Sequence, residues 1–149
     1  RLVLADGLEQ ARQLKCRTVI DLATLTGACV VALGKHKAGL FSSDEKLAEK
    51  LEAAAADSGE PVWRLPYEQT YIDEIKGRIA DLKNIGSSKW GGACTAAAFL
   101  GEFAKGLSWA HLDIAGKMDA SDPMKKYADA GSIGFGVRLL TSFIMNEVF

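Results

Sequence analysis

The hydrophobic pattern predicts alternating helices and strands from the first residues onward. Apolar residues recur every three or four positions over Arg1–Lys15, which predicts an amphipathic helix that begins without a capping side chain. Thr18–Ala23 is rich in β-branched residues and leucine and is typical of a buried strand. The run ends in Thr24-Leu25-Thr26-Gly27, whose small and hydroxylated residues predict a loop. A second apolar run, Cys29–Leu33, ends at Gly34 and is counted with the strands.

The next segments continue this alternation. Gly39–Phe41 predicts a third strand, and Ser42-Ser43-Asp44 supplies capping side chains for a helix that runs to about Asp57 and stops at Gly59. Two prolines bound Pro61–Pro66, which predicts an extended linker. The remaining expectations are a helix over Tyr67–Ile75, an extended segment or short strand over Ala80–Asn84, a loop over Ile85–Gly92, a buried helix over Ala93–Ala104, a strand over Trp109–Ile114, a polar loop over Asp119–Gly131 and an amphipathic helix over Gly136–Phe149. This order favours an α/β fold in layers.

Composition narrows the class of protein. The 149 residues fit one domain, and 18 Lys and Arg against 19 Asp and Glu give no electrostatic case for nucleic acid or a membrane surface. No apolar run reaches the length of a membrane span. The three cysteines lie far apart, which favours neither a disulfide framework nor a zinc finger and suggests a reducing compartment. Because the chain opens at Arg1, without Met or a signal peptide, we expect it to be part of a longer protein.

Two stretches are candidates for ligand contact on chemical grounds. In open α/β sheets, ligands bind outside the carboxyl ends of strands, so Thr24–Gly27 is either a pocket wall or a structural loop. Gly91-Gly92, just before a helix of small residues, allows either close approach of a ligand or another backbone, or tight packing of the helix on the sheet. A phosphate loop at Gly27–Lys35 is rejected because six residues separate its glycines. The glycines of Gly131–Gly136 follow no strand and predict a loop before a helix.

The two histidines do not predict a catalytic centre. His36 lies between Lys35 and Lys37 and is expected to be solvated. His111 lies within a strand-like run, where alternation places it on the same face as Asp113; a structural histidine is favoured over a catalytic one. No His-Glu-x-x-His zinc motif is present.

Taken together, several segments resemble the C-terminal part of the catalytic domain of the leucine aminopeptidases, the di-metal cytosol aminopeptidase family. They occur in family order: Arg1–Asp6, Ala23–Ala28, Val62–Pro66, Asp81–Gly86, Gly92–Phe99 and Trp109–Met118. The resemblance implies that residues 1–149 form the C-terminal portion of a layered α/β domain with a mixed β-sheet flanked by helices. The N-terminal domain and the first part of the catalytic domain would lie outside this chain.

The family's hallmark, Asn-Thr-Asp-Ala-Glu-Gly-Arg-Leu, survives here only as Arg1 and Leu2. By resemblance, its acidic metal ligands would lie before Arg1, so we assign no metal ligand in this chain. Arg1 matches the catalytic arginine that holds a bicarbonate-like anion, a task suited to the fixed donor geometry of a guanidinium. Thr24, Gly27, Ala115 and Met118 match positions around the substrate's first side chain. Leu25 and Ile85 match positions near the next residue, with the backbone of Leu25 available for hydrogen bonding.

The implied activity is release of N-terminal leucine or other apolar residues from peptides by a metal-activated water. The implied cofactors are two divalent ions, zinc or manganese with magnesium as a further option. The resemblance also implies a homohexamer in the cytoplasm. The balanced charge of the chain argues against a nucleic-acid or membrane partner. This chain alone is expected to be inactive. The alternative is a binding or structural role, as a non-catalytic relative or as a family member that also binds nucleic acid. An intact Asp and Glu immediately upstream of Arg1 would favour the enzyme, and their replacement would indicate a non-catalytic relative.

Overall fold

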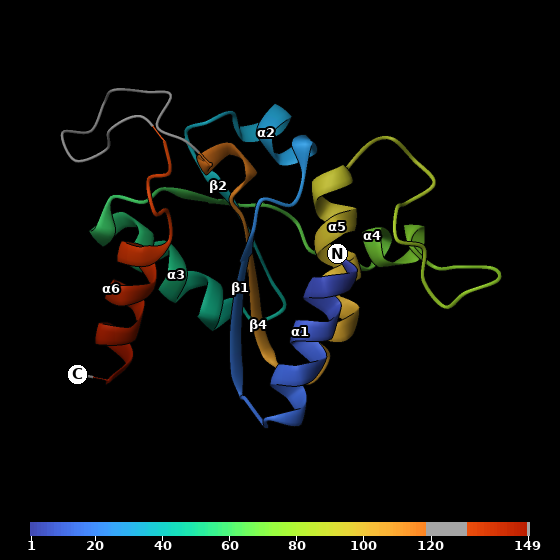
Figure 1. Cartoon of the computed structure of the whole chain (residues 1–149), viewed down its shortest axis with the longest axis horizontal. Helices are drawn as coiled ribbons and strands as arrows, with labels where there is room; N and C mark the ends of the chain where they lie inside the picture. Colours follow the sequence, from blue (N-terminus) through green and yellow to red (C-terminus); the bar gives the residue numbers. More distant parts are fainter. Residues whose placement is uncertain (119–130, 149) are drawn as a thin grey trace.

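The computed structural model describes residues 1–118 and 131–148 and shows a four-stranded mixed sheet between helices (Figure 1). The strands are β1 (Thr18–Ala23), β2 (Ala38–Ser42), β3 (Val62–Arg64) and β4 (Ser108–Asp113), in the spatial order β1-β4-β2-β3. The pairs β1–β4 and β2–β3 are parallel, and β2–β4 is antiparallel. The predicted α/β class and mixed sheet are therefore confirmed.

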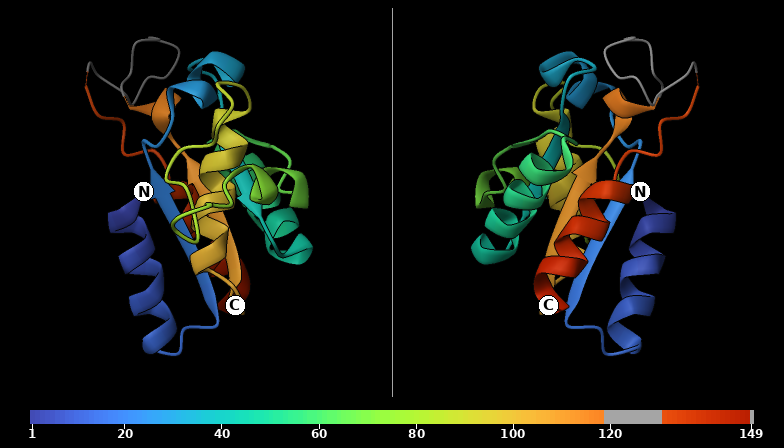
Figure 2. Two further views of the ribbon diagram at one scale, coloured as in Figure 1. Left: turned by 90° about the vertical axis from the view of Figure 1, so that its right-hand side faces the viewer. Right: turned by 90° about the vertical axis from the view of Figure 1, so that its left-hand side faces the viewer.

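Helices cover both faces of the sheet (Figure 2). On one face, α1 (Leu2–Gln13) and α5 (Gly92–Phe103) pack over a core that contains Phe41 and Trp109. On the other, α3 (Glu45–Ser58) and α6 (Val137–Val148) enclose a second core around Leu112. The period-two alternation of β4 separates the two cores, because Trp109 faces the first while Ala110 and Leu112 face the second.

Short elements occupy the carboxyl end of the parallel pair β1–β4. Helix α2 (Gly27–Leu33) follows β1, and the 3₁₀ helix η1 (Ala115–Lys117) follows β4. Both lie at the same end of the sheet, at the top of Figure 1. The register pairs Ala23 with Asp113, so the chain leaves both strands at the same level. A further short helix, α4 (Gln69–Glu74), packs against α5.

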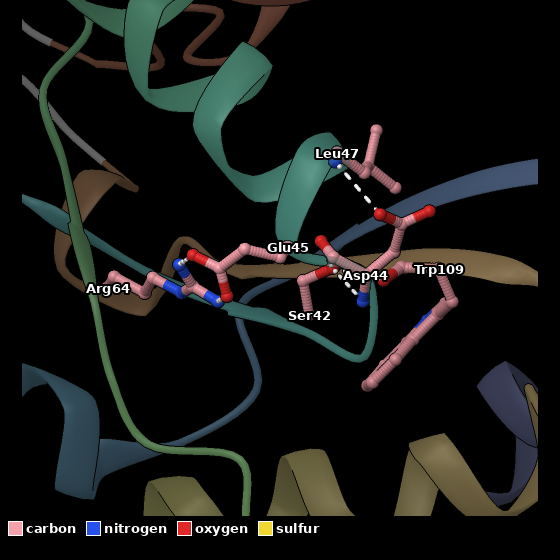
Figure 3. Close-up of polar contacts among 6 residues, drawn as sticks. All are labelled: Ser42, Asp44, Glu45, Leu47, Arg64 and Trp109. Carbon is pink, nitrogen blue, oxygen red and sulfur yellow. Dashed lines mark hydrogen bonds and ion pairs between the residues drawn. The ribbon is translucent and has the colours of Figure 1, made fainter.

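Capping side chains set the start of α3, as the sequence predicts (Figure 3). Asp44 accepts a hydrogen bond from the amide of Leu47 at 3.2 Å, and Gly59 ends the helix in the left-handed conformation at φ 66°. Ser42 donates to the carbonyl oxygen of Trp109 at 2.6 Å, which ties the end of β2 to β4. Arg64 pairs with Glu45 through both terminal nitrogens of its guanidinium, connecting β3 to the first turn of α3.

Three expectations about local structure differ from what is observed. Cys29–Leu33, counted with the strands, is helical because Thr26 caps α2 and accepts from the amide of Cys29 at 3.0 Å. A short apolar run fits a strand and a buried helix equally well. The expected linker Pro61–Pro66 instead contains β3. Ala80–Asn84 contributes only one isolated bridge, between Leu82 and Lys76.

The other predicted elements are found within a few residues of their expected bounds. The helix expected over Tyr67–Ile75 is shorter, and those expected over Ala93–Ala104 and Gly136–Phe149 begin within one residue of their predicted starts. The first helix begins without a side-chain cap, as expected. The expected polar loop over Asp119–Gly131 lies outside the described residues except for Gly131.

Candidate functional site at the carboxyl ends of β1 and β4

The carboxylate of Asp113 joins the two chain segments that leave the parallel strands. Its Oδ1 accepts hydrogen bonds from the amides of Leu25 at 3.2 Å, Thr26 at 3.4 Å and Ala115 at 3.2 Å. Its Oδ2 accepts from the hydroxyl of Thr26 at 2.6 Å. Asp113 is fully buried, so these four donors replace the water that its charge would otherwise bind.

This arrangement brings five of the predicted site residues to one edge of the sheet. Thr24 and Leu25 lie in the loop that follows β1 (residues 24–26, the β1 loop), and Gly27 is the first residue of α2. Ala115 is the first residue of η1, and Met118 follows its last residue. Thr24 and Gly27 are exposed and Leu25 is partly buried, whereas Ala115 is buried against this turn. Met118 is 58% exposed, so its side chain is accessible at this edge. The amide of Leu25 is engaged by Asp113.

Arg1 lies near the same edge, at the start of α1. Its guanidinium donates to the carbonyl oxygen of Asn84, which connects α1 to the long segment before α5. Burial lowers the pKa of Arg1, and the nearby negative charge of Asp113 acts in the opposite direction. An arginine keeps its charge even so, because its ordinary pKa lies far above neutral pH. Ile85 follows Asn84 directly and is 70% exposed.

The cysteines and glycines near this edge serve packing in the described structure. Burial raises the pKa of Cys29 to about 11, with the charge of Asp113 as a second cause, so its thiol stays protonated at neutral pH. Cys29 also approaches the carbonyl oxygen of Asp113 at 3.7 Å. A Cβ added to Gly92 would lie 3.1 Å from the Cβ of Ala28, so the glycine permits close packing of α5 on α2. This contact fits the packing interpretation of Gly92, although its neighbour is helix α2 and not the sheet.

The histidines occupy the positions that the sequence predicts. His36 is exposed, and His111 is fully buried with its Nδ1 2.6 Å from Oδ1 of Asp21. Its ring stacks against the rings of Phe41 and Trp109. This buried position fits the structural interpretation of His111. Its partner is Asp21, and its buried Nε2 has no hydrogen-bond partner among the described residues.

The described residues hold no group of three or more His, Cys, Asp or Glu side chains arranged to bind a metal ion. The residues of this edge offer backbone groups, one guanidinium and a carboxylate already saturated with hydrogen bonds. Such a set is suited to binding a polar backbone and an apolar side chain and does not fit a metal centre. No helix in the described parts of the chain is long and apolar enough to cross a bilayer.

A mixed sheet between helical layers, with small residues at the carboxyl ends of its parallel pair and an arginine nearby, is the arrangement in which α/β domains typically bind ligands. The chain belongs to the cytosol aminopeptidase family, whose catalytic domain matches residues 1–141. A probable cytosol aminopeptidase of Histophilus somni is 50% identical over 147 residues, covering 99% of this chain and 28% of that protein. One from Rhodopirellula baltica is 47% identical, covering 98% of this chain and 29% of that protein.

The structural comparison agrees with the sequence comparison. A mutant of tomato leucine aminopeptidase superimposes with a TM-score of 0.87 at 40% identity, covering 97% of this chain and 28% of that chain. The present chain therefore spans less than a third of the length of these relatives.

Sequence reasoning did not find the residues that hold the site together. The sequence pattern indicates only that Asp113 shares a strand face with His111 and that Thr26 belongs to the Thr-Leu-Thr-Gly loop. Two features of the sequence could have identified Asp113. It is the last residue of a strand whose other residues are mostly apolar, and it precedes a glycine-containing turn. A carboxylate at that position can accept hydrogen bonds from the amides of a tight turn.

Proposed function

We propose that the full-length protein is a metal-dependent aminopeptidase that releases N-terminal leucine or other apolar residues from peptides. The observation that carries this proposal is the junction at Asp113, which brings Thr24–Gly27 and Ala115–Met118 to one edge of the sheet. These are the two segments expected to line a side-chain pocket. Family membership supports the same activity. Residues 1–149 are the C-terminal portion of the catalytic domain in this proposal.

Each site residue has a role in this proposal. Thr24, Gly27, Ala115 and Met118 surround the first side chain of the substrate, and the flexible thioether of Met118 adapts to apolar side chains of different shape. Leu25 and Ile85 contact the following residue. Because the amide of Leu25 already donates to Asp113, its carbonyl oxygen is the group we propose to accept a hydrogen bond from the substrate.

Arg1 is proposed to bind a bicarbonate-like anion that acts as the base for the attacking water. A guanidinium held in place by the carbonyl oxygen of Asn84 offers its remaining donors in a fixed geometry. The two divalent ions, zinc or manganese with magnesium as an alternative, are proposed to bind to residues that precede Arg1. The described residues themselves do not fit a metal centre. A homohexamer in the cytoplasm, without membrane or nucleic-acid partners, completes the proposal; the names of the relatives support this location.

The test is hydrolysis of leucyl amides by the full-length protein, with and without added divalent metal. We expect metal-dependent turnover, and we expect Arg1→Ala to lower kcat by at least about tenfold, with partial recovery in added bicarbonate. A purified protein of residues 1–149 alone should show no turnover. Activity of that fragment would contradict our placement of the metal ligands, and an inactive full-length protein would favour the non-catalytic alternative.

A further inference from the structure

We propose that Asp113 is the positioning residue of the substrate pocket: one buried carboxylate fixes the separation of its two walls. This inference rests on the proposed function, because it takes the β1 loop and η1 to be those walls. It adds that the substrate selectivity of the pocket depends on a residue that does not itself contact the substrate.

The geometry supports this role because the hydrogen bonds converge from both sides. Leu25 and Thr26 donate from the β1 loop, and Ala115 donates from the turn after β4. In the parallel register Ala23 lies opposite Asp113, so the two segments leave the sheet side by side, with the carboxylate between them. A backbone hydrogen bond also joins the two segments, because the amide of Ile114 donates to the carbonyl oxygen of Ala23 at 2.8 Å.

Thr26 extends the effect of Asp113 to helix α2. Its hydroxyl donates to Asp113 at 2.6 Å and accepts from the amide of Cys29 at 3.0 Å. The same side chain therefore caps α2 and fixes the helix start to the carboxylate. Gly27, a proposed pocket residue, is the first residue of that helix. A shift of Asp113 would thus move both Gly27 and Ala115.

Because Asp113 and Thr26 are buried, loss of one of their hydrogen bonds is expected to change the positions of the β1 loop and η1. Asp113 is 0% exposed and Thr26 is 9% exposed, so water cannot readily replace a lost hydrogen bond. A hydrophobic pocket distinguishes substrates that differ by one methylene by about 10–200-fold, so we expect a displaced wall to change the preference between side chains of different size. We therefore expect the effect of a lost contact to appear mainly in KM and in the preference between large and small side chains.

The experiment compares four variants of the full-length protein with the wild type, using leucyl and alanyl amides as substrates. Asp113→Asn keeps one oxygen for the amide donors but loses the charge and the acceptor for the Thr26 hydroxyl. Thr26→Val removes the hydroxyl, and Thr26→Ser retains it. Thr141→Val is the matched control, because it removes a hydroxyl that donates to the carbonyl oxygen of Val137 on the exposed side of α6.

We expect Asp113→Asn and Thr26→Val to raise KM for the leucyl amide about tenfold and to change kcat by less than about threefold. The ratio of kcat/KM for the leucyl over the alanyl amide should fall about tenfold. Thr26→Ser and Thr141→Val should remain within about twofold of the wild type. Unchanged KM and selectivity in Asp113→Asn and Thr26→Val would overturn the inference. An equal loss of kcat/KM for both substrates would also overturn it, because that is the result of a merely structural role.

Amide hydrogen exchange provides a readout that does not depend on activity. Peptides that cover residues 24–28 and 114–117 should exchange at least about tenfold faster in Thr26→Val than in Thr26→Ser. Unchanged exchange in both segments would refute the positioning role. If Asp113→Asn does not fold, Thr26→Val decides the question. If the wild type cleaves no amide, the proposed function fails, and exchange alone decides whether Asp113 holds the two segments together.

Discussion

Asp21 and His111 form a hydrogen bond between the neighbouring parallel strands β1 and β4, with Oδ1 and Nδ1 2.6 Å apart. The other oxygen of Asp21 accepts from the indole N–H of Trp109 at 2.8 Å. One carboxylate thus fixes two aromatic side chains that stack in the first core. The proposed pocket lies at the end of the same two strands, so this hydrogen bonding supports the sheet beneath it.

Asp21→Ala should destabilise the full-length protein by about 3 kcal/mol, because the indole N–H and the imidazole of His111 would lose their acceptor in the core. The measurement is the midpoint of urea unfolding, followed by tryptophan fluorescence. Asp6→Ala, at an exposed position of α1, is the matched control and should change stability by less than about 0.5 kcal/mol. Similar midpoints for the two variants would contradict a stabilising role for the Asp21 carboxylate.

The side chain of Glu60 caps the start of α6. Its buried carboxylate accepts from the amides of Gly136 at 3.0 Å and Leu139 at 2.9 Å, and Arg138 lies 3.3 Å away. Glu60→Ala should cost about 2–3 kcal/mol, because these buried amides would lose their acceptor. Glu60→Gln, which retains an oxygen, should cost less.

The Glu60 prediction can be checked by thermal unfolding and by amide exchange in α6. Glu52→Ala, an exposed glutamate on α3, serves as the control and should leave both measurements close to those of the wild type. If exchange at Gly136 and Leu139 were as slow in Glu60→Ala as in the wild type, the capping role would be wrong.

The sequence predicts what depends on local pattern and misses what depends on distant partners. Asp44 and Gly59 bound α3 because capping and the left-handed stop are local properties of the chain. Glu60 caps a helix that begins 77 residues later, at Val137, and nothing near Glu60 in the sequence indicates that partner. Similarly, β3 is three residues long, and its pairing with β2 is invisible in a segment bounded by prolines.

The same distinction between local pattern and distant partners applies to the candidate site. The loop after β1 could be predicted as a pocket wall from its position at a strand end. The distance between this loop and Ala115 could not be predicted. It depends on the parallel pairing of β1 with β4 and on the four hydrogen bonds to Asp113. The family resemblance supplied the choice of Thr24, Leu25, Gly27, Ile85, Ala115 and Met118, and their roles stay predictions.

The carboxylate of Asp44 predicts a pH dependence of stability. Hydrogen bonds from Ser108 and from the amide of Leu47 hold the pKa of Asp44 below its ordinary value of 3.8. A lowered folded-state pKa means that its contribution is fully present above the unfolded value and is lost as pH falls through the folded value. The contribution of Asp44 to the free energy of unfolding should therefore begin to fall below pH 3.8.

The measurement for Asp44 is the unfolding midpoint of the wild type and of Asp44→Asn across this range. An asparagine still caps the helix but carries no charge, so its midpoint should vary less with acid. The two proteins should differ most above pH 3.8 and converge at lower pH. A difference that grows as pH falls would contradict the assigned direction of the pKa shift.

Gly116 tests how closely η1 must approach the turn after α2. A Cβ at this position would overlap the carbonyl oxygen of Gly34, which belongs to the backbone and cannot rotate away. Gly116→Ala should therefore destabilise the protein by about 2 kcal/mol and shift Ala115 and Met118 away from the β1 loop. If these residues line the pocket, KM for a leucyl amide should rise at least about threefold. Gly7→Ala is the matched control, because no atom beyond its chain neighbours and the local helix backbone lies within 4 Å of its added Cβ in the exposed part of α1. Alanine there should stabilise the helix by about 0.5–1 kcal/mol and leave KM unchanged. Equal stability of the two variants would refute the close approach of η1 to Gly34, and an unchanged KM in Gly116→Ala would count against Ala115 and Met118 as pocket residues.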